Sequence, residues 1–247
     1  MPSEIVEEYL EAIFKLGSEG RDVGLSRLAE HLKVTPASVS ETVRRMEAQG
    51  LVRYQGRGRG RGPAADSRSG GGHRHGRPSD DEPQSLRKGV TLTAKGERLA
   101  RTLVRRHRLS ERFLTDMLGM DWEKAHQEAC KLEHALSPET EGRLADLLGN
   151  PDTCPHGHPI PDADGRIRER KLKKLSECGE DERGCIDRVE EEEPQMLQYL
   201  SSLGLLPEVE VEVKEVAPFN GPLLVKAGGA QYALGREVAS KIWLRKK

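Results

Sequence analysis

The stretch that decides the fold is Leu25–Tyr54, LSRLAEHLKVTPASVSETVRRMEAQGLVRY. Its first part repeats apolar residues at helical spacing, namely Leu25, Leu28, Ala29 and Leu32. A short turn follows, and Pro36 suits the first turn of a second helix. Three apolar residues of that helix share its inward face: Val39, Val43 and Met46. The pattern predicts two short helices joined by a tight turn, and a strand after Gly50.

The outward face of the second helix carries side chains typical of a DNA-recognition helix. Small polar residues near its start and arginines further along fit a major groove. The expected DNA-contacting residues are Thr35, Pro36, Ala37, Ser38, Ser40, Glu41, Arg44 and Arg45. LVRY and Val90–Thr93 predict the two strands of a β wing. A three-helix packing unit without a DNA role is the alternative, and the wing pattern favours DNA binding.

The segment between the predicted wing strands, residues 56–88, is of low complexity. It is rich in glycine, proline, serine and arginine and has almost nothing to bury, so we expect it to be disordered. Either it is an inert elongated loop, or its Arg-Gly repeats form an arm that touches DNA phosphate or enters a minor groove.

The composition limits the classes of protein that need considering. Lys plus Arg (40) nearly balances Asp plus Glu (41), so any basic surface must be local. There is no basic start followed by an apolar stretch, and no apolar run of about 18 residues, so we expect neither export nor a membrane span. A cytoplasmic location follows as an expectation, with the four cysteines as thiols or ligands rather than disulfides.

The second half carries polar residues at metal-ligand spacing. In a predicted helix from Ala94 to Met117, His107 and Glu111 lie four residues apart inside a leucine stripe, where an unpaired polar group is costly. The next predicted helix, DWEKAHQEACKLEHAL, has a buried stripe of Trp122, Ala125, Ala129, Leu132 and Leu136. Potential ligands line one edge of that stripe: His126, Cys130, Glu133 and His134. A thiolate, a carboxylate and an imidazole together suit a divalent transition metal, although a satisfied His–carboxylate pair is the alternative for His107 and Glu111.

An additional acidic pair lies near the start of the chain. A first helix over Ser3–Leu16 has a core stripe of Val6, Tyr9, Ile13 and Leu16. Glu8 and Glu11 fall on its opposite face, where a solvated acidic surface is the plain interpretation.

Several motifs are distributed over the chain: E-E-Y-L-E-A-I, V-S-E-T-V-R-R-M-E, L-T-A-K-G, R-H-R-L-S-E-R-F-L, H-Q-E-A-C-K-L-E-H-A-L-S and C-P-H-G-H-P-I-P. Together they resemble the diphtheria toxin repressor family of iron- and manganese-dependent regulators. The resemblance implies a mainly α fold with small β parts, in three domains. These are a winged helix-turn-helix domain over 1–98, a metal-binding and dimerisation domain over 99–170, and a C-terminal SH3-like β barrel over 176–247.

The resemblance also implies two metal positions for Mn²⁺ or Fe²⁺. One uses His107, Glu111 and His126, with Glu192 and Gln195 from the C-terminal domain. The other uses Cys130, Glu133, His134 and Glu8, and manganese-type members also use the position of Glu11. Glu8 is a manganese-type ligand and Cys130 an iron-type one; oxygen ligands favour Mn²⁺, so two carboxylates against one thiol favour manganese.

The functional expectation is a homodimeric, metal-dependent repressor of metal-uptake genes that binds a palindromic operator. It has no small-molecule substrate and is not an enzyme. The alternative is a metalloenzyme or a metal carrier built on Cys130, Glu133 and His134. C-P-H-G-H-P-I-P, Cys154–Pro161, looks like half of a zinc knuckle, but we expect a structural loop there. Cys178 and Cys185 are expected to be thiols.

Overall fold

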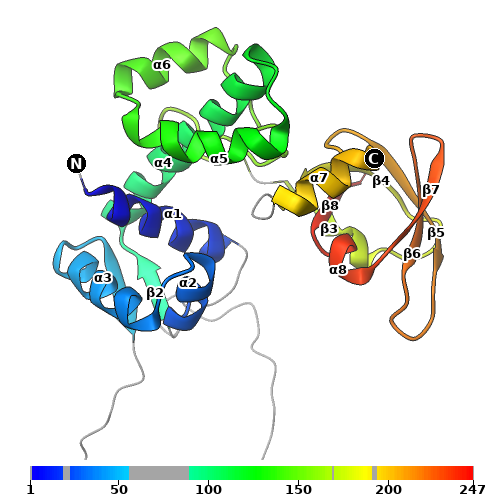
Figure 1. Cartoon of the computed structure of the whole chain (residues 1–247), viewed down its shortest axis with the longest axis horizontal. Helices are drawn as coiled ribbons and strands as arrows, with labels where there is room; N and C mark the ends of the chain where they lie inside the picture. Colours follow the sequence, from blue (N-terminus) through cyan, green and yellow to red (C-terminus); the bar gives the residue numbers. More distant parts are fainter. Residues whose placement is uncertain (1, 19–22, 56–88, 169, 191–193, 247) are drawn as a thin grey trace, which may run out of the picture. The chain divides into compact units, whose positions relative to one another are not determined.

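The computed structural model describes residues 2–18, 23–55, 89–168, 170–190 and 194–246. They form two compact units, Met1–Arg101 and Thr102–Lys247 (Figure 1). The low-complexity segment 56–88 and Glu192 lie outside the described residues. Every helix within these ranges is too short or too polar to cross a lipid bilayer.

The N-terminal unit begins with three helices: α1 (Glu4–Ser18), α2 (Leu25–His31) and α3 (Pro36–Ala48). Thr35 caps α3, because its side chain accepts a hydrogen bond from the backbone N–H of Ser38, and Pro36 occupies the first turn. Gly50 adopts a positive φ of 68° just after α3, a conformation that favours glycine. The predicted pair of helices with a tight turn is therefore present.

The core of this unit follows the predicted stripes. Val6, Tyr9, Ile13 and Leu16 of α1 are buried, and so are Val39, Val43 and Met46 of α3. The expectation of a solvated acidic face on α1 is wrong for Glu11, which is only 8% exposed and lies 3.1 Å from the ammonium of Lys15. Glu8 is exposed as expected.

Two short strands follow the helices. β1 (Val52–Gln55) pairs antiparallel with β2 (Gly89–Leu92), with Val52 opposite Leu92 and Gln55 opposite Gly89. The next helix, α4 (Ala94–Arg112), starts directly after β2, and its Gly96 packs against the backbone of Leu51.

The second unit contains most of the ligand-bearing helices. A single helix was expected as far as Met117, but α4 ends at Arg112 and continues as one π-helical turn, η2 (Phe113–Met117). The second predicted helix is α5 (Trp122–Leu132), which tightens into the 3-10 turn η3 (Glu133–Ala135) and is followed by α6 (Pro138–Leu147). Ala125 and Ala129 are buried as predicted, but Leu132 is 37% exposed.

A six-stranded antiparallel sheet with order β3-β8-β4-β5-β6-β7 forms the C-terminal part. Its strands are β3 (Lys173–Lys174), β4 (Arg183–Val189), β5 (Glu210–Val216), β6 (Leu223–Ala227), β7 (Ala230–Leu234) and β8 (Ile242–Arg245). Two helices, α7 (Pro194–Ser202) and α8 (Arg236–Ala239), accompany it, together with a 3-10 turn, η4 (Leu175–Glu177). The core gathers residues of the strands and of both helices, including Ile186, Leu197, Val213 and Ala239.

The expected closed barrel is not formed within this sheet. Irregularities in the β4–β8 and β5–β6 pairings let the sheet curl. The edge strand β3 has only two residues and pairs with β8 alone, while β7 pairs with β6 alone, so the described strands leave two edges.

The close approach of α4 to Leu51 gives a stability prediction. A Cβ at residue 96 would lie 2.0 Å from the Leu51 carbonyl oxygen, so Gly96→Ala should lower the free energy of unfolding by about 1–3 kcal/mol. Gly142→Ala in α6 is the matched control, since nothing lies within 4 Å of its Cβ position, and it should be neutral or slightly stabilising. Urea denaturation of both variants is the measurement; equal stabilities would contradict the packing argument.

Candidate metal centre and DNA-binding face

The centre begins with two side chains of α4. His107 and Glu111 are one helical turn apart, and both are fully buried. His107 Nε2 lies 3.1 Å from Glu111 Oε1. A carboxylate in this position must have positive charge or hydrogen-bond donors around it, because burial of an isolated charge is strongly unfavourable.

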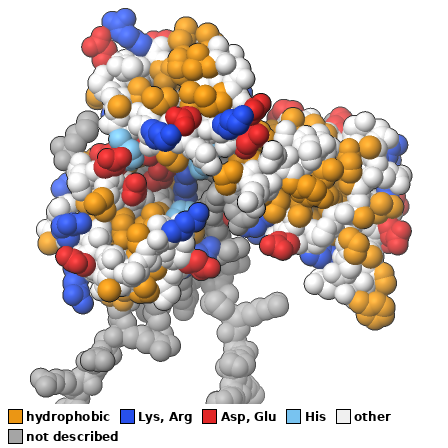
Figure 2. Space-filling model, viewed as in Figure 1, with side chains coloured by type: hydrophobic (Ala, Val, Ile, Leu, Met, Phe, Trp, Pro, Cys, Tyr) orange, Lys and Arg blue, Asp and Glu red, His pale blue; other side chains and the backbone are white. Residues whose placement is uncertain are grey.

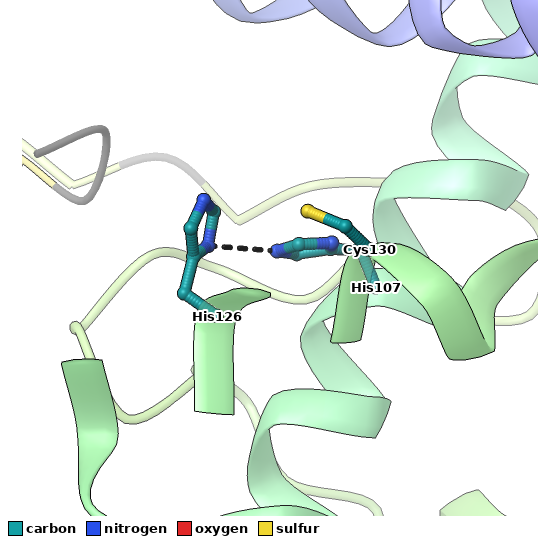
Figure 3. Close-up of side chains that lie close together, drawn as sticks. All are labelled: His107, His126 and Cys130. Carbon is teal, nitrogen blue, oxygen red and sulfur yellow. Dashed lines mark hydrogen bonds between the residues drawn. The ribbon is translucent and has the colours of Figure 1, made fainter. Parts of the chain in front are cut away.

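His126 of α5 joins this pair. Its Nδ1 lies 2.9 Å from Glu111 Oε1 and 3.1 Å from His107 Nε2, and the two imidazole rings meet edge to face. Figure 3 shows the two histidines joined by that contact, with the Cys130 thiol close by. The structure therefore brings together His107, Glu111 and His126, the three helical residues of the first expected metal position.

The second expected set meets the first at His107. The Nδ1 atom of His107 lies 2.6 Å from Glu133 Oε2, and His134 Nε2 lies 3.3 Å from Glu133 Oε1. The thiol of Cys130 and one nitrogen each of His107 and His126 all lie within 4.8 Å of one another. His107 thus faces Glu111 and His126 with one ring nitrogen and Glu133 with the other.

Two further potential ligands come from the loop that sequence analysis treated as structural. His156 Nδ1 lies 3.3 Å from Glu111 Oε1. Ligand atoms of Glu111, Cys154 and His156 lie within 4.8 Å of one another, and all three residues are buried. The C-x-H spacing was visible in the sequence, but its partner Glu111 is distant in the chain, so spacing alone could not complete the set.

The remaining expected ligands belong to other segments of the chain. Gln195 is exposed on α7, and Glu192 falls outside the described residues. Glu8 and Glu11 belong to α1 of the N-terminal unit.

The charges of the centre stabilise one another. Burial by itself raises the pKa of Glu111, but the nearby His156 and His107 and the hydrogen bonds to His107 and His126 hold it well below the ordinary 4.5. Burial likewise lowers the pKa of His156, but the Glu111 carboxylate and the contact with Cys154 outweigh it and raise that pKa well above 6.5. The buried Glu111 carboxylate and the His156 imidazole therefore stabilise each other's charged forms.

The donor atoms fit a divalent transition metal. Glu111 Oε2 is buried and has no hydrogen-bond partner among the described residues, which is the situation that a bound cation would relieve. Imidazole, carboxylate and thiol groups around this oxygen are ligands that Mn²⁺, Fe²⁺ and Zn²⁺ accept.

The predicted DNA-binding residues are accessible on α3. Thr35, Pro36, Ala37, Ser38, Glu41, Arg44 and Arg45 are exposed, and Ser40 is half-buried. Thr35 Oγ1 and Ser38 Oγ lie 2.9 Å apart at the start of the helix. Acidic and basic side chains are interspersed on the face shown in Figure 2, as the balanced composition leads one to expect.

Comparison with known proteins assigns families to three successive segments. Residues 1–59 match the iron-dependent repressor N-terminal DNA-binding domain, 93–162 match the iron-dependent repressor metal-binding and dimerisation domain, and 173–246 match the FeoA domain. The iron-dependent repressor IdeR of Mycobacterium leprae is 31% identical over 256 residues, covering 98% of this chain and 97% of the relative. The diphtheria toxin repressor of Corynebacterium diphtheriae is 36% identical over 161 residues, which is 65% of this chain and 58% of the relative.

Solved structures agree with this result. A manganese-dependent transcriptional repressor in complex with manganese is 31% identical and superposes with a TM-score of 0.80 over 98% of this chain and all of the other. ScaR with bound Zn²⁺ is 27% identical with a TM-score of 0.75, and each chain is covered completely. The chain belongs to the iron-dependent repressor family.

The paired pKa shifts predict how the stability of the metal-free protein depends on pH. The His156 contribution is fully present below its unfolded pKa of about 6.5 and is lost as pH rises through its raised folded pKa. The Glu111 contribution is present above about 4.5 and is lost as pH falls through its lowered folded pKa. With a chelator present, His156→Gln should therefore lower the free energy of unfolding most between about pH 4.5 and 6.5, by about 2 kcal/mol. The loss should become progressively smaller at alkaline pH. Urea denaturation from about pH 5 to 10 measures this, and a cost that grows with pH would contradict it.

Proposed function

We propose that the chain is a metal-dependent transcriptional repressor that binds operator DNA as a homodimer and controls metal-uptake genes. The observation that carries the proposal is the buried Glu111, which three imidazoles surround and whose second oxygen has no partner among the described residues. The same chain exposes a helix, α3, whose side chains suit the major groove of DNA. The similarity to metal-dependent repressors over nearly the whole chain supports the same function. Such a protein works beside the chromosome, so the proposal includes a cytoplasmic location.

The proposed division of labour has three parts. The winged helix-turn-helix domain, 1–98, would read DNA through α3, with β1 and β2 as the wing. The segment 99–170 would bind metal and dimerise, and 176–247 would be an SH3-like domain of the FeoA type. Two reading helices in a dimer match the two-fold symmetry of a palindromic operator. Metal can favour DNA binding only to the extent that it binds the DNA-competent conformation more tightly than the conformation that does not bind DNA.

The ligands that we propose fall into two groups that are linked by the contact between His107 and Glu133. One group is His107, Glu111 and His126, extended by Cys154 and His156; the other is Cys130, Glu133 and His134. Glu8, Glu11, Glu192 and Gln195 complete the proposal on the strength of the family resemblance. The relatives are repressors rather than enzymes, so the metalloenzyme and carrier alternatives gain no support from them.

The central prediction is that specific DNA binding requires a divalent metal. Chelation should abolish binding to promoter DNA of metal-uptake genes, and added Mn²⁺ or Fe²⁺ should restore it. Glu133→Ala should raise the metal concentration for half-maximal binding by about tenfold or more, since it removes a side chain in direct contact with His107. Glu128→Ala, at an exposed ion pair of α5, is the control. Gel shifts give the answer, and unchanged binding by thoroughly demetallated protein would overturn the proposal.

Metal preference gives a separate prediction. We propose that Mn²⁺ is preferred over Fe²⁺, because Glu8 and Glu11 provide hard oxygen ligands. Glu8→Met replaces a carboxylate with a softer thioether and should shift the DNA-binding response towards Fe²⁺. Anaerobic metal titrations of wild type and variant measure the ratio of the two responses. A wild type that responds to Fe²⁺ at the lower free concentration would show that the thiols govern the preference.

A further inference from the structure

The loop that carries Cys154 and His156 is poor in backbone hydrogen-bond donors. Prolines occupy positions 151, 155, 159 and 161, and proline has no backbone N–H. Such a segment can form neither a helix nor a regular strand pair, yet buried carbonyl groups still need donors. Some of these donors must therefore come from outside the loop.

The loop nevertheless has a defined hairpin-like shape. Thr153 and Pro159 form an antiparallel bridge, and the backbone N–H of Cys154 donates to the His158 carbonyl at 2.9 Å. The N–H of Gly157 donates to the Cys154 carbonyl at 2.9 Å. The tip of this hairpin therefore holds Cys154 and His156, and the bridge marks its base.

Three arginines of α4 supply the missing donors. Arg112 Nε donates to the Thr153 carbonyl at 2.7 Å, and Arg108 Nη1 donates to the Pro159 carbonyl at 2.5 Å. Arg105 Nη1 donates to the Pro161 carbonyl at 2.6 Å. Arg112 and Arg108 thus hold the two residues that form the base of the hairpin, one on each arm.

The arginines and the ligands share one helix. Positions 105, 108 and 112 follow helical spacing along one stripe of α4, and His107 and Glu111 lie on the adjacent stripe. A single rigid element therefore fixes both the carboxylate and the base of the loop. Arg105 is itself held by Glu141 of α6 at 3.0 Å, and Arg108 is only 6% exposed.

The loop also contacts the strand β4, through hydrogen bonds and close backbone packing. The N–H of Val189 donates to the His156 carbonyl at 3.0 Å, and His158 Nε2 lies 2.9 Å from the Val189 carbonyl. Gly157 has a φ of 88°, and a Cβ there would lie 1.9 Å from the Asp187 carbonyl oxygen. The loop is thus fixed by β4 on one side and by the arginines on the other.

We propose that Arg108 and Arg112 are positioning residues of the metal centre, which hold the base of the 153–161 hairpin so that Cys154 and His156 reach Glu111. They donate to carbonyl groups of the loop and need not touch the metal. The inference about metal affinity rests on the proposed function; the inference about the position of Cys154 does not.

The test combines thiol labelling with metal titration. In chelated protein, wild type, Arg108→Ala and Arg112→Ala are treated with iodoacetamide, and the labelling rate of each cysteine is followed by mass spectrometry. Loss of a hydrogen bond from a charged donor should favour local opening and raise Cys154 labelling by about tenfold or more. Cys178, buried in the core around the C-terminal sheet, should label at the wild-type rate and serves as the internal control for global unfolding. Mn²⁺ affinity should fall by about 10- to 100-fold.

Matched variants separate positioning from other effects. Arg112 also contacts Asp116, so Asp116→Ala should leave Cys154 labelling and Mn²⁺ affinity unchanged, as should Arg143→Ala at an exposed pair of α6. Arg112→Lys, which keeps a long charged donor, should restore part of both readouts. If an alanine variant unfolds, as shown by labelling of Cys178, glutamine at the same position takes its place.

If Cys154 is labelled at the wild-type rate in the Arg108 and Arg112 variants, the proposal is overturned. This outcome does not depend on the proposed function, which would fall separately if the wild-type protein failed to bind Mn²⁺. Faster labelling with unchanged Mn²⁺ affinity would also overturn the proposal, since the position of Cys154 would then not matter to the metal.

Discussion

The constraint on which the second unit depends is the burial of one carboxylate. Glu111 is fully buried, so its charge must be balanced inside the protein. His107, His126 and His156 all converge on the same oxygen, from α4, α5 and the proline-rich loop. The need to neutralise Glu111 therefore fixes the relative positions of three segments that are far apart in the chain. Its second oxygen has no hydrogen-bond partner among the described residues, which a divalent cation could supply.

The helix α4 organises this region by using two adjacent stripes for two purposes. One stripe presents His107 and Glu111, and the next presents arginines to the carbonyl groups of the 153–161 loop. Prolines leave the loop with few backbone donors, and arginines of α4 add strong charge-assisted hydrogen bonds to its carbonyl groups. The shortage of backbone donors that prevents the loop from forming regular structure also makes it dependent on α4. Because α4 carries Glu111 as well, one helix holds both the loop and the carboxylate.

The two ligand groups meet at His107, which keeps the centre compact. His107 contacts Glu111 and His126 through one nitrogen and Glu133 through the other, and Cys130 lies close to the same rings. A cation that entered either group would compete with these contacts. Metal binding would thus reorganise hydrogen bonds that already exist, and its net effect on the DNA-binding state would depend on the difference between the two sets of interactions.

The sequence by itself determined the elements that repeat with a local period. The stripes of α1 and α3, the pair His107 and Glu111, and the grouping of Cys130, Glu133 and His134 all follow from spacing within one helix. Only the tertiary structure decided that Cys154 and His156 join Glu111, that Glu11 is buried, that Leu132 is exposed and that the C-terminal sheet stays open. These features depend on which distant segments meet, and periodicity along a chain carries no information about contacts between its separate parts.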